Sequence, residues 1–138
     1  ALHAAKTGRY QFVVGNPPYL AYPELDDSTR KYLRKHFASC SKGKPDYYYA
    51  FIESALSSLA PDGKLAYLVP GNFMKNLYSE KLRQLILPSL YEIIDYSHQR
   101  IFGDVLTSSV ILYCDKATVT NTVHYEDKHY KRINTRKI

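Results

Sequence analysis

The chain has 138 residues, of which 45% are apolar and 23% charged, and a net charge of +6, which is the composition of one folded domain and excludes wholesale disorder. Its apolar runs, such as Leu65–Val69, fall far short of the roughly 20 residues that a membrane-spanning helix needs, so that class of protein is excluded. With no signal-peptide-like apolar region at the N-terminus and only two cysteines, we expect a cytoplasmic protein without a membrane partner.

The first half of the chain alternates strand and helix patterns. Residues 10–14 are aromatic and β-branched and stop at a glycine, which predicts a buried strand. Two successive prolines lack N–H groups, so Asn16–Tyr19 is predicted to be a rigid loop at the carboxyl end of that strand. Helices are predicted over 28–37 and from a capping Asp46 to about residue 59, joined by a loop.

The second half continues the alternation. A turn at Pro61–Gly63 precedes an apolar strand over 65–69, and a third helix is predicted over 79–87. No helix separates the next two strands, 91–96 and 109–114, so we expect an antiparallel pair at one edge of the sheet. The order of elements predicts an α/β fold.

The end of the chain has weaker signals. Residues 122–125 are compatible with a short strand, and the basic, polar tail from Lys128 is expected to fray. We therefore predict a domain over residues 1–120, followed by a basic tail or the start of another segment over 121–138.

Two loops are predicted to share one rim. Ligands of α/β sheets bind outside the carboxyl ends of the strands, which places Asn16–Tyr19 beside Pro70–Phe73. The prolines leave carbonyl groups free to accept hydrogen bonds, the Asn16 side chain adds a second acceptor, and Tyr19 adds a flat ring. Two acceptors and one ring, held rigidly, suit a planar group that carries an exocyclic NH₂.

The sequence Gly15-Asn16-Pro17-Pro18-Tyr19 after an apolar strand resembles the catalytic loop of S-adenosylmethionine-dependent amino-methyltransferases, above all the adenine-N6 DNA methyltransferases. Residues 46–53, 63–73 and 101–110 resemble later segments of the same family. Over residues 10–115 the chain resembles the gamma-class enzymes of bacterial restriction–modification systems, types IIG and I. The resemblance implies the second half, strands four to seven, of a Rossmann-like class I methyltransferase sheet.

The resemblance also implies roles for named residues. Asn16, Pro17, Pro18 and Tyr19 would form the catalytic loop, in which the Asn16 side-chain oxygen and the Pro17 carbonyl accept the hydrogens of the adenine amino group. The base must be flipped out of double-stranded DNA to be reached, and Tyr19 would stack on it. Phe102 matches the family position that packs against the flipped base from another side, although a core aromatic is an equal alternative.

One part of the family pattern is missing. The family binds S-adenosylmethionine with a glycine-containing loop and acidic residues upstream of the Asn-Pro-Pro-Tyr loop, and residues 1–9 contain no such pattern. We therefore expect the C-terminal half of a catalytic domain, inactive alone, with little cofactor contact beyond Asn16. Another part of the parent enzyme, or another chain, is expected to cover the unpaired apolar edge of strand 10–14.

Other readings remain open. Arg30, Lys31, Arg34 and Lys35 suit DNA phosphates as well as a solvated helix face. An RNA adenine or a protein glutamine is an alternative substrate, because its NH₂ group poses the same chemical problem. A truncated, non-catalytic nucleic-acid-binding module is a third alternative. The five histidines show no metal-ligand spacing, so no metal site is predicted.

Overall fold

The computed structural model describes residues 8–97, 99–102, 105–118, 122–128 and 132–137. The α-helices are α1 (Asp27–His36), α2 (Tyr48–Ser58) and α3 (Glu80–Ile86), and short 3₁₀ turns are η1 (Tyr22–Glu24), η2 (Ala38–Cys40), η3 (Gly71–Met74) and η4 (Leu77–Ser79). The strands are β1 (Tyr10–Gly15), β2 (Leu59–Pro70), β3 (Leu90–Asp95), β4 (Gln99–Phe102), β5 (Val105–Thr107), β6 (Ser109–Asp115), β7 (Thr122–Asp127) and β8 (Arg132–Lys137).

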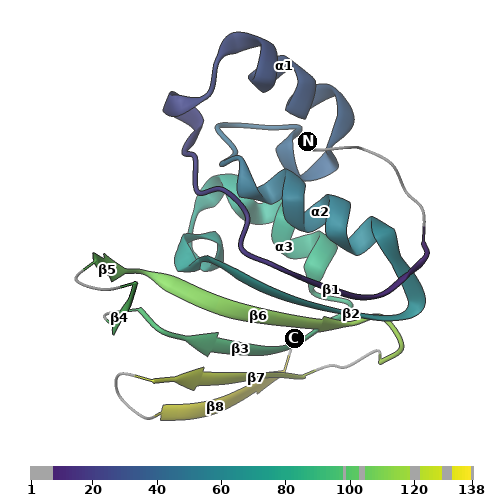
Figure 1. Cartoon of the computed structure of the whole chain (residues 1–138), viewed down its shortest axis with the longest axis vertical. Helices are drawn as coiled ribbons and strands as arrows, with labels where there is room; N and C mark the ends of the chain where they lie inside the picture. Colours follow the sequence, from purple (N-terminus) through teal and green to yellow (C-terminus); the bar gives the residue numbers. More distant parts are fainter. Residues whose placement is uncertain (1–7, 98, 103–104, 119–121, 129–131, 138) are drawn as a thin grey trace.

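Six strands form one mixed sheet in the order β1-β2-β6-β3-β7-β8, and β4 pairs with β5 in a separate hairpin. β1 runs parallel to β2 and β3 runs parallel to β7, whereas β6 is antiparallel to both β2 and β3. Figure 1 shows α2 and α3 together on one face of this sheet. The α/β prediction is therefore confirmed. Within the described residues, no helix is long and apolar enough to cross a membrane.

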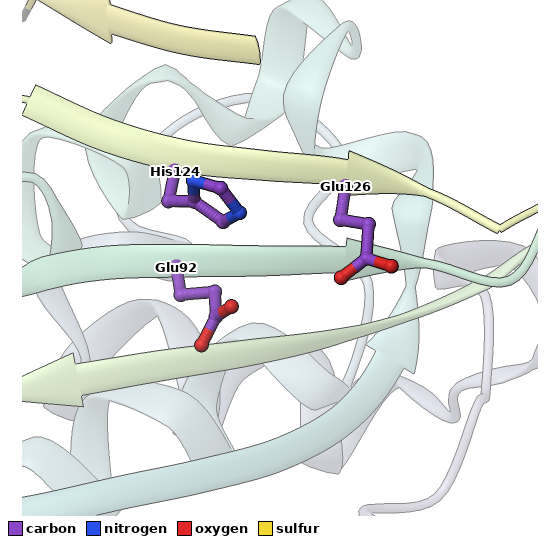
Figure 2. A group of neighbouring side chains, drawn as sticks. All are labelled: Glu92, His124 and Glu126. Carbon is purple, nitrogen blue, oxygen red and sulfur yellow. The ribbon is translucent and has the colours of Figure 1, made fainter. Parts of the chain in front are cut away.

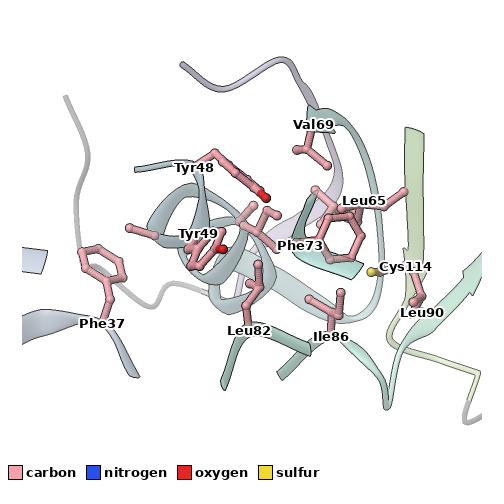
Figure 3. Packing of buried hydrophobic residues seen from close by; sticks show 14 of the residues in the cluster. Phe37, Tyr48, Tyr49, Leu65, Val69, Phe73, Leu82, Ile86, Leu90 and Cys114 are labelled. Atoms are coloured by element: carbon pink, nitrogen blue, oxygen red, sulfur yellow. The ribbon is translucent and has the colours of Figure 1, made fainter. Parts of the chain in front are cut away.

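Apolar side chains at helical spacing join α2 and α3 to the sheet. Tyr48, Tyr49 and Ile52 of α2 and Leu82 and Ile86 of α3 are almost completely buried. They pack in one core with residues of the central strands (Leu65, Val69, Leu112 and Cys114) and with Phe73 of η3 (Figure 3). Burial of this kind is the main source of stability for such short helices, which would be marginal in isolation.

The start of α1 is set by a side-chain cap. Asp26 Oδ1 accepts a hydrogen bond from Thr29 N at 2.8 Å, which satisfies one of the backbone donors left free at a helix start. Hydrogen bonds from the side chain and then the backbone of Thr29 lower the pKa of Asp26. The last turn carries Arg34 and Lys35, whose positive charges suit the carboxyl end of a helix.

Three local expectations were wrong. The predicted turn at Pro61–Gly63 lies inside β2 instead of before it. These residues form an irregularity in the pairing with β1, in which Tyr10 pairs with Leu59 and Phe12 pairs with Lys64. The antiparallel pair β3–β6 lies in the middle of the sheet, since β7 and β8 extend it beyond β3. The tail that was expected to fray contains β8, because its backbone pairs with β7 despite polar side chains.

The strand predicted over residues 10–14 forms as β1, but the expectation that it is buried was also wrong, because none of its residues is buried and β2 is its one partner within the described residues. The expectation of an unpaired apolar edge is confirmed. β1 lies at one end of the strand order, and Tyr10, Phe12 and Val14 are 54%, 72% and 80% exposed. Val13, between them in the sequence, packs against the core. Because alternate residues of a strand face opposite sides, the three exposed residues form an apolar stripe on the side of the sheet away from the core.

Candidate functional site

The Asn16–Tyr19 loop begins where β1 ends, at the rim of the sheet. Pro17 is buried, whereas Asn16, Pro18 and Tyr19 are exposed. The Pro17 ring fixes the φ angle of its residue, and its burial holds this part of the loop to the rest of the domain. The loop therefore presents the Asn16 amide to solvent from a rigid base.

Hydrogen bonds secure the far end of this loop. The Tyr19 hydroxyl donates to Leu68 O of β2 at 2.9 Å, and Tyr47 N donates to Leu20 O at 2.9 Å. Partial burial raises the pKa of Tyr19, so the phenol stays protonated and remains a donor at neutral pH. The ring keeps 38% of its surface exposed, enough for another flat group to contact it.

Gly15 allows the close approach of a neighbouring ring at the start of the loop. A Cβ atom at this position would lie 2.9 Å from Cε1 of Tyr67, the residue with which Gly15 pairs on β2. Any larger residue would displace the Tyr67 ring, which packs against the core. The glycine before Asn16 is thus explained by packing.

A second loop at the same rim carries a side-chain network. Asn72, just after β2, accepts from the Tyr48 hydroxyl at 2.5 Å through Oδ1 and donates from Nδ2 to Asp46 Oδ2 at 3.0 Å. The other oxygen of Asp46 accepts from Tyr22 N at 3.3 Å. These bonds connect the segment after Tyr19 to the start of α2 and to the end of β2.

The network corrects the predicted role of Asp46. The residue that caps α2 is Tyr47, without a side-chain cap, and the Asp46 carboxylate bonds to Tyr22 and Asn72 instead. Sequence reasoning missed this network, since its members lie 24 to 26 positions apart. The available signal was the placement of Asn72 at a strand end on the predicted rim. Tyr48 has its pKa raised, chiefly by burial, and so acts as a donor.

The β4–β5 hairpin leaves the sheet at this same end (Figure 1). Gly71 N donates to Ser108 O at 2.8 Å, and Tyr96 N donates to Ser109 O at 3.0 Å, which holds the base of the hairpin to the rim. Phe102 is the last residue of β4, but its side chain lies outside the described residues. Its predicted contact with a base stays a prediction.

The basic residues of α1 fall into two kinds. Arg30 donates to Tyr22 O at 3.1 Å and stacks over the Tyr22 ring, and Arg34 donates to Gly43 O at 3.0 Å. Both arginines therefore hold neighbouring loops in place. Lys31 and Lys35 are exposed on the same helix, and they are the better candidates of the four for contact with phosphate groups.

The rim thus combines an exposed Asn16 amide, two prolines that stiffen the loop and a Tyr19 ring held through its hydroxyl group. An acceptor site of this kind can orient and polarise an NH₂ group by hydrogen bonding, without a strong base. Both cysteines, Cys40 and Cys114, are buried, and burial raises the pKa of each thiol to about 12, so neither serves as a nucleophile at neutral pH.

Residues 1–102 match the family model of the Eco57I restriction-modification methylases. The chain belongs to this family. It is 32% identical over 135 residues to the type II restriction enzyme and methyltransferase RM.Eco57I of Escherichia coli, an alignment that covers 93% of this chain and 13% of the relative. The chain therefore spans about one-eighth of the length of that relative.

Solved structures of other proteins show the same fold. A protein of Listeria monocytogenes assigned to the class I S-adenosylmethionine-dependent methyltransferases matches 85% of this chain and 36% of its own chain, with a TM-score of 0.63 and 23% identity. DrdV, solved as a complex with DNA, matches 93% of this chain and 17% of its own, with a TM-score of 0.66 and 14% identity. The predicted partial class I methyltransferase sheet is therefore confirmed.

Proposed function

We propose that this chain supplies the amino-group-binding part of an S-adenosylmethionine-dependent methyltransferase that modifies the exocyclic N6 of adenine in double-stranded DNA. One observation carries the proposal: an exposed Asn16 amide on a proline-stiffened loop at the end of β1, in a member of a restriction–modification methylase family. The DNA complex of a protein with the same fold supports DNA as the partner.

The chemical difficulty is the adenine amino group, whose lone pair is delocalised into the ring. Asn16 Oδ1 and the carbonyl of Pro17 accept its two hydrogens, which draws the nitrogen toward a tetrahedral geometry and localises the lone pair. S-adenosylmethionine, when bound, supplies the methyl group as an electrophilic sulfonium. Because the acceptors orient and polarise the amine, no general base of unusual pKa is required in the loop. The N–CH₃ bond would form as the S–CH₃ bond breaks, S-adenosylhomocysteine would leave, and the methylated nitrogen would lose one proton to solvent.

The base reaches the loop only outside the duplex. Tyr19 stacks on the flipped adenine, and such stacking contributes about 1–3 kcal/mol, which is comparable to the cost of unstacking. The bond from the Tyr19 hydroxyl to Leu68 O fixes the plane of this ring in advance. Phe102 packs on the base from another side, and Lys31 and Lys35 contact the DNA phosphates.

The residues of this chain fit only one side of the cofactor. Asn16 is the residue that we assign to it, because it stands at the carboxyl end of β1, where ligands of such sheets bind. The free edge of β1 leaves room for further strands, which would bring the remaining cofactor contacts.

The test uses a hybrid enzyme in which this chain replaces the segment of RM.Eco57I that aligns with it. Methyl-labelled S-adenosylmethionine is offered with adenine-containing DNA, with RNA of the same sequence and with a glutamine peptide, and the products are digested and identified. We expect N6-methyladenine in DNA alone. Label in RNA or in the peptide would move the proposal to those substrates, and DNA binding without any transfer would favour the non-catalytic alternative.

A further inference from the structure

Three possible metal ligands meet on the sheet, far along the chain from the catalytic loop. They are Glu92 of β3 and His124 and Glu126 of β7, and one ligand atom of each lies within 4.8 Å of the other two. All three residues are half-buried. Figure 2 shows their side chains on the same side of the two strands.

The strand register places these side chains together. Glu92 and His124 are direct partners in the parallel pair of β3 and β7, and Glu126 follows His124 by two residues, which returns it to the same face. Val123 and Tyr125, which alternate with them, pack toward the core instead. The three ligands therefore stand on regular backbone at neighbouring positions, on the face of the sheet away from the core.

We propose that Glu92, His124 and Glu126 bind one divalent transition-metal ion of the Zn²⁺ class. Imidazole nitrogen and carboxylate oxygen are ordinary ligands of this ion, at about 2.0–2.2 Å, so two ligand atoms of a tetrahedral site lie about 3.4 Å apart. The ligand atoms, all within 4.8 Å of one another, would have to move closer by about an ångström to reach that value. A histidine ligand favours Zn²⁺ or Co²⁺ over Mg²⁺ and Ca²⁺, which prefer oxygen alone.

A cation already approaches the cluster in the structure. The Lys128 ammonium group contacts Glu126 Oε1. The lysine side chain is 36% exposed, so it can turn into solvent when a metal ion takes its place. The two carboxylates of Glu92 and Glu126 carry two negative charges, which a divalent ion would balance and the single positive charge of Lys128 does not.

The ion would tie the last two strands to the rest of the sheet. β7 joins the sheet through β3 alone, and β8 joins through β7. His124 and Glu126 also lie beyond residue 102, where the match to the family model ends. The site is therefore a feature of this part of the chain, independent of the proposed methyl transfer.

The experiment titrates Zn²⁺ into the chelator-treated chain by calorimetry and follows Co²⁺ binding by its visible absorption. We expect one ion per chain and a thermal midpoint raised by about 3 °C or more at a hundredfold excess over Kd. Glu92→Gln and His124→Asn are expected to weaken binding by more than about tenfold, because each removes a ligand. Lys128→Met is expected to strengthen it, because the competing cation is gone.

His36→Asn is the matched control, since His36 is an exposed histidine on α1, outside the cluster. It should leave the affinity for Zn²⁺ unchanged. Absence of Zn²⁺ binding by the parent chain, unchanged affinity after His124→Asn, or an equal loss after His36→Asn would each overturn the proposal. Circular dichroism checks the fold, and if His124→Asn is unfolded, Glu126→Gln and Lys128→Met decide the question.

Discussion

The two outer strands of the sheet differ in character. β1 exposes Tyr10, Phe12 and Val14 along one stripe, whereas the sequence of β8, at the other end, includes Arg132, Arg136 and Lys137. Charged residues on the outer strands of a sheet keep other strands from pairing there. By this criterion β8 has the composition of an edge strand, and β1 has the composition of an interior strand. The Asn16–Tyr19 loop is attached to β1, the strand whose composition suits a further neighbour.

This difference places the Asn16–Tyr19 loop between the described sheet and the open edge of β1. Asn16 follows directly from the end of β1, and its loop is fixed on the β2 side by the Tyr19 bond to Leu68 O. The other side of the loop faces the unpaired edge of β1, where a further strand could pair. A cofactor bound between two halves of a sheet would meet Asn16 from that side, which agrees with the proposed function.

The largest effect is expected where β1 is joined to β2. A Cβ atom on Gly63 would lie 2.8 Å from Tyr10 O and 3.0 Å from Ala60 O, and backbone atoms cannot move aside as a side chain can. Gly63→Val should lower the free energy of unfolding by about 3 kcal/mol, measured by urea denaturation. Asp62→Ala, at the exposed position before the buried Gly63, is the control and should cost little. Equal stability of the two variants would show that β1 is not held through this register.

The next effect concerns the opposite side of the sheet. Asp95 is only 7% exposed and accepts hydrogen bonds from the Tyr125 hydroxyl and from Ser97 N. Tyr125→Phe removes one of these donors and should destabilise the chain by about 1–3 kcal/mol, because a buried carboxylate loses a partner. Tyr78→Phe, at an exposed position, should change stability much less in the same urea titration. If Tyr78→Phe destabilised the chain more than Tyr125→Phe, the hydrogen bond from Tyr125 of β7 to Asp95 of β3 would not contribute to stability as we expect.

The stripe on β1 is expected to affect association rather than stability. Phe12→Thr with Val14→Thr keeps β-branched residues in the strand but removes exposed apolar surface. The free energy of unfolding should change by no more than about 0.5 kcal/mol, while sedimentation should show less self-association. A loss of several kcal/mol would mean that these side chains are buried in solution, and β1 would then not be an open edge.

The smallest effect is expected at the two thiols, whose reactivity measures how far the core is exposed to solvent. Burial raises the pKa of Cys40 and Cys114 from 9.0 to about 12, so neither should react with a thiol reagent at pH 8 until urea unfolds the chain. Above pH 9 the unfolded chain loses these protons and the folded chain keeps them, so stability should fall as pH rises toward 12. Rapid labelling of the folded chain at pH 8 would contradict this.

Much of the fold could be predicted because the signals are local. The strand 10–14, the loop at Pro17 and Pro18, and the helices over 28–37 and 79–87 are each specified by a short run of neighbouring residues. The rim was predictable as well, since strand direction alone places Asn16–Tyr19 beside Pro70–Phe73.

The remaining features depend on partners distant in sequence. The Asp46 carboxylate has the sequence position of a helix cap, and only the folded chain brings Asn72 and Tyr22 to it. The residues of β8 lack an apolar pattern, so its pairing with β7 leaves no periodic signal. The cluster of Glu92, His124 and Glu126 depends in the same way on the register between β3 and β7.

The central claim is that the Asn16 oxygen accepts a hydrogen from the substrate amine, and single-turnover methyl transfer to DNA by the hybrid enzyme tests it most directly. Asn16→Ala should lower the rate by about 10²–10³, whereas Asn16→Asp, which keeps an acceptor oxygen, should retain much more activity. Gln84→Ala, an exposed amide on α3, should leave the rate unchanged. Full activity after Asn16→Ala in a folded hybrid enzyme would contradict the account.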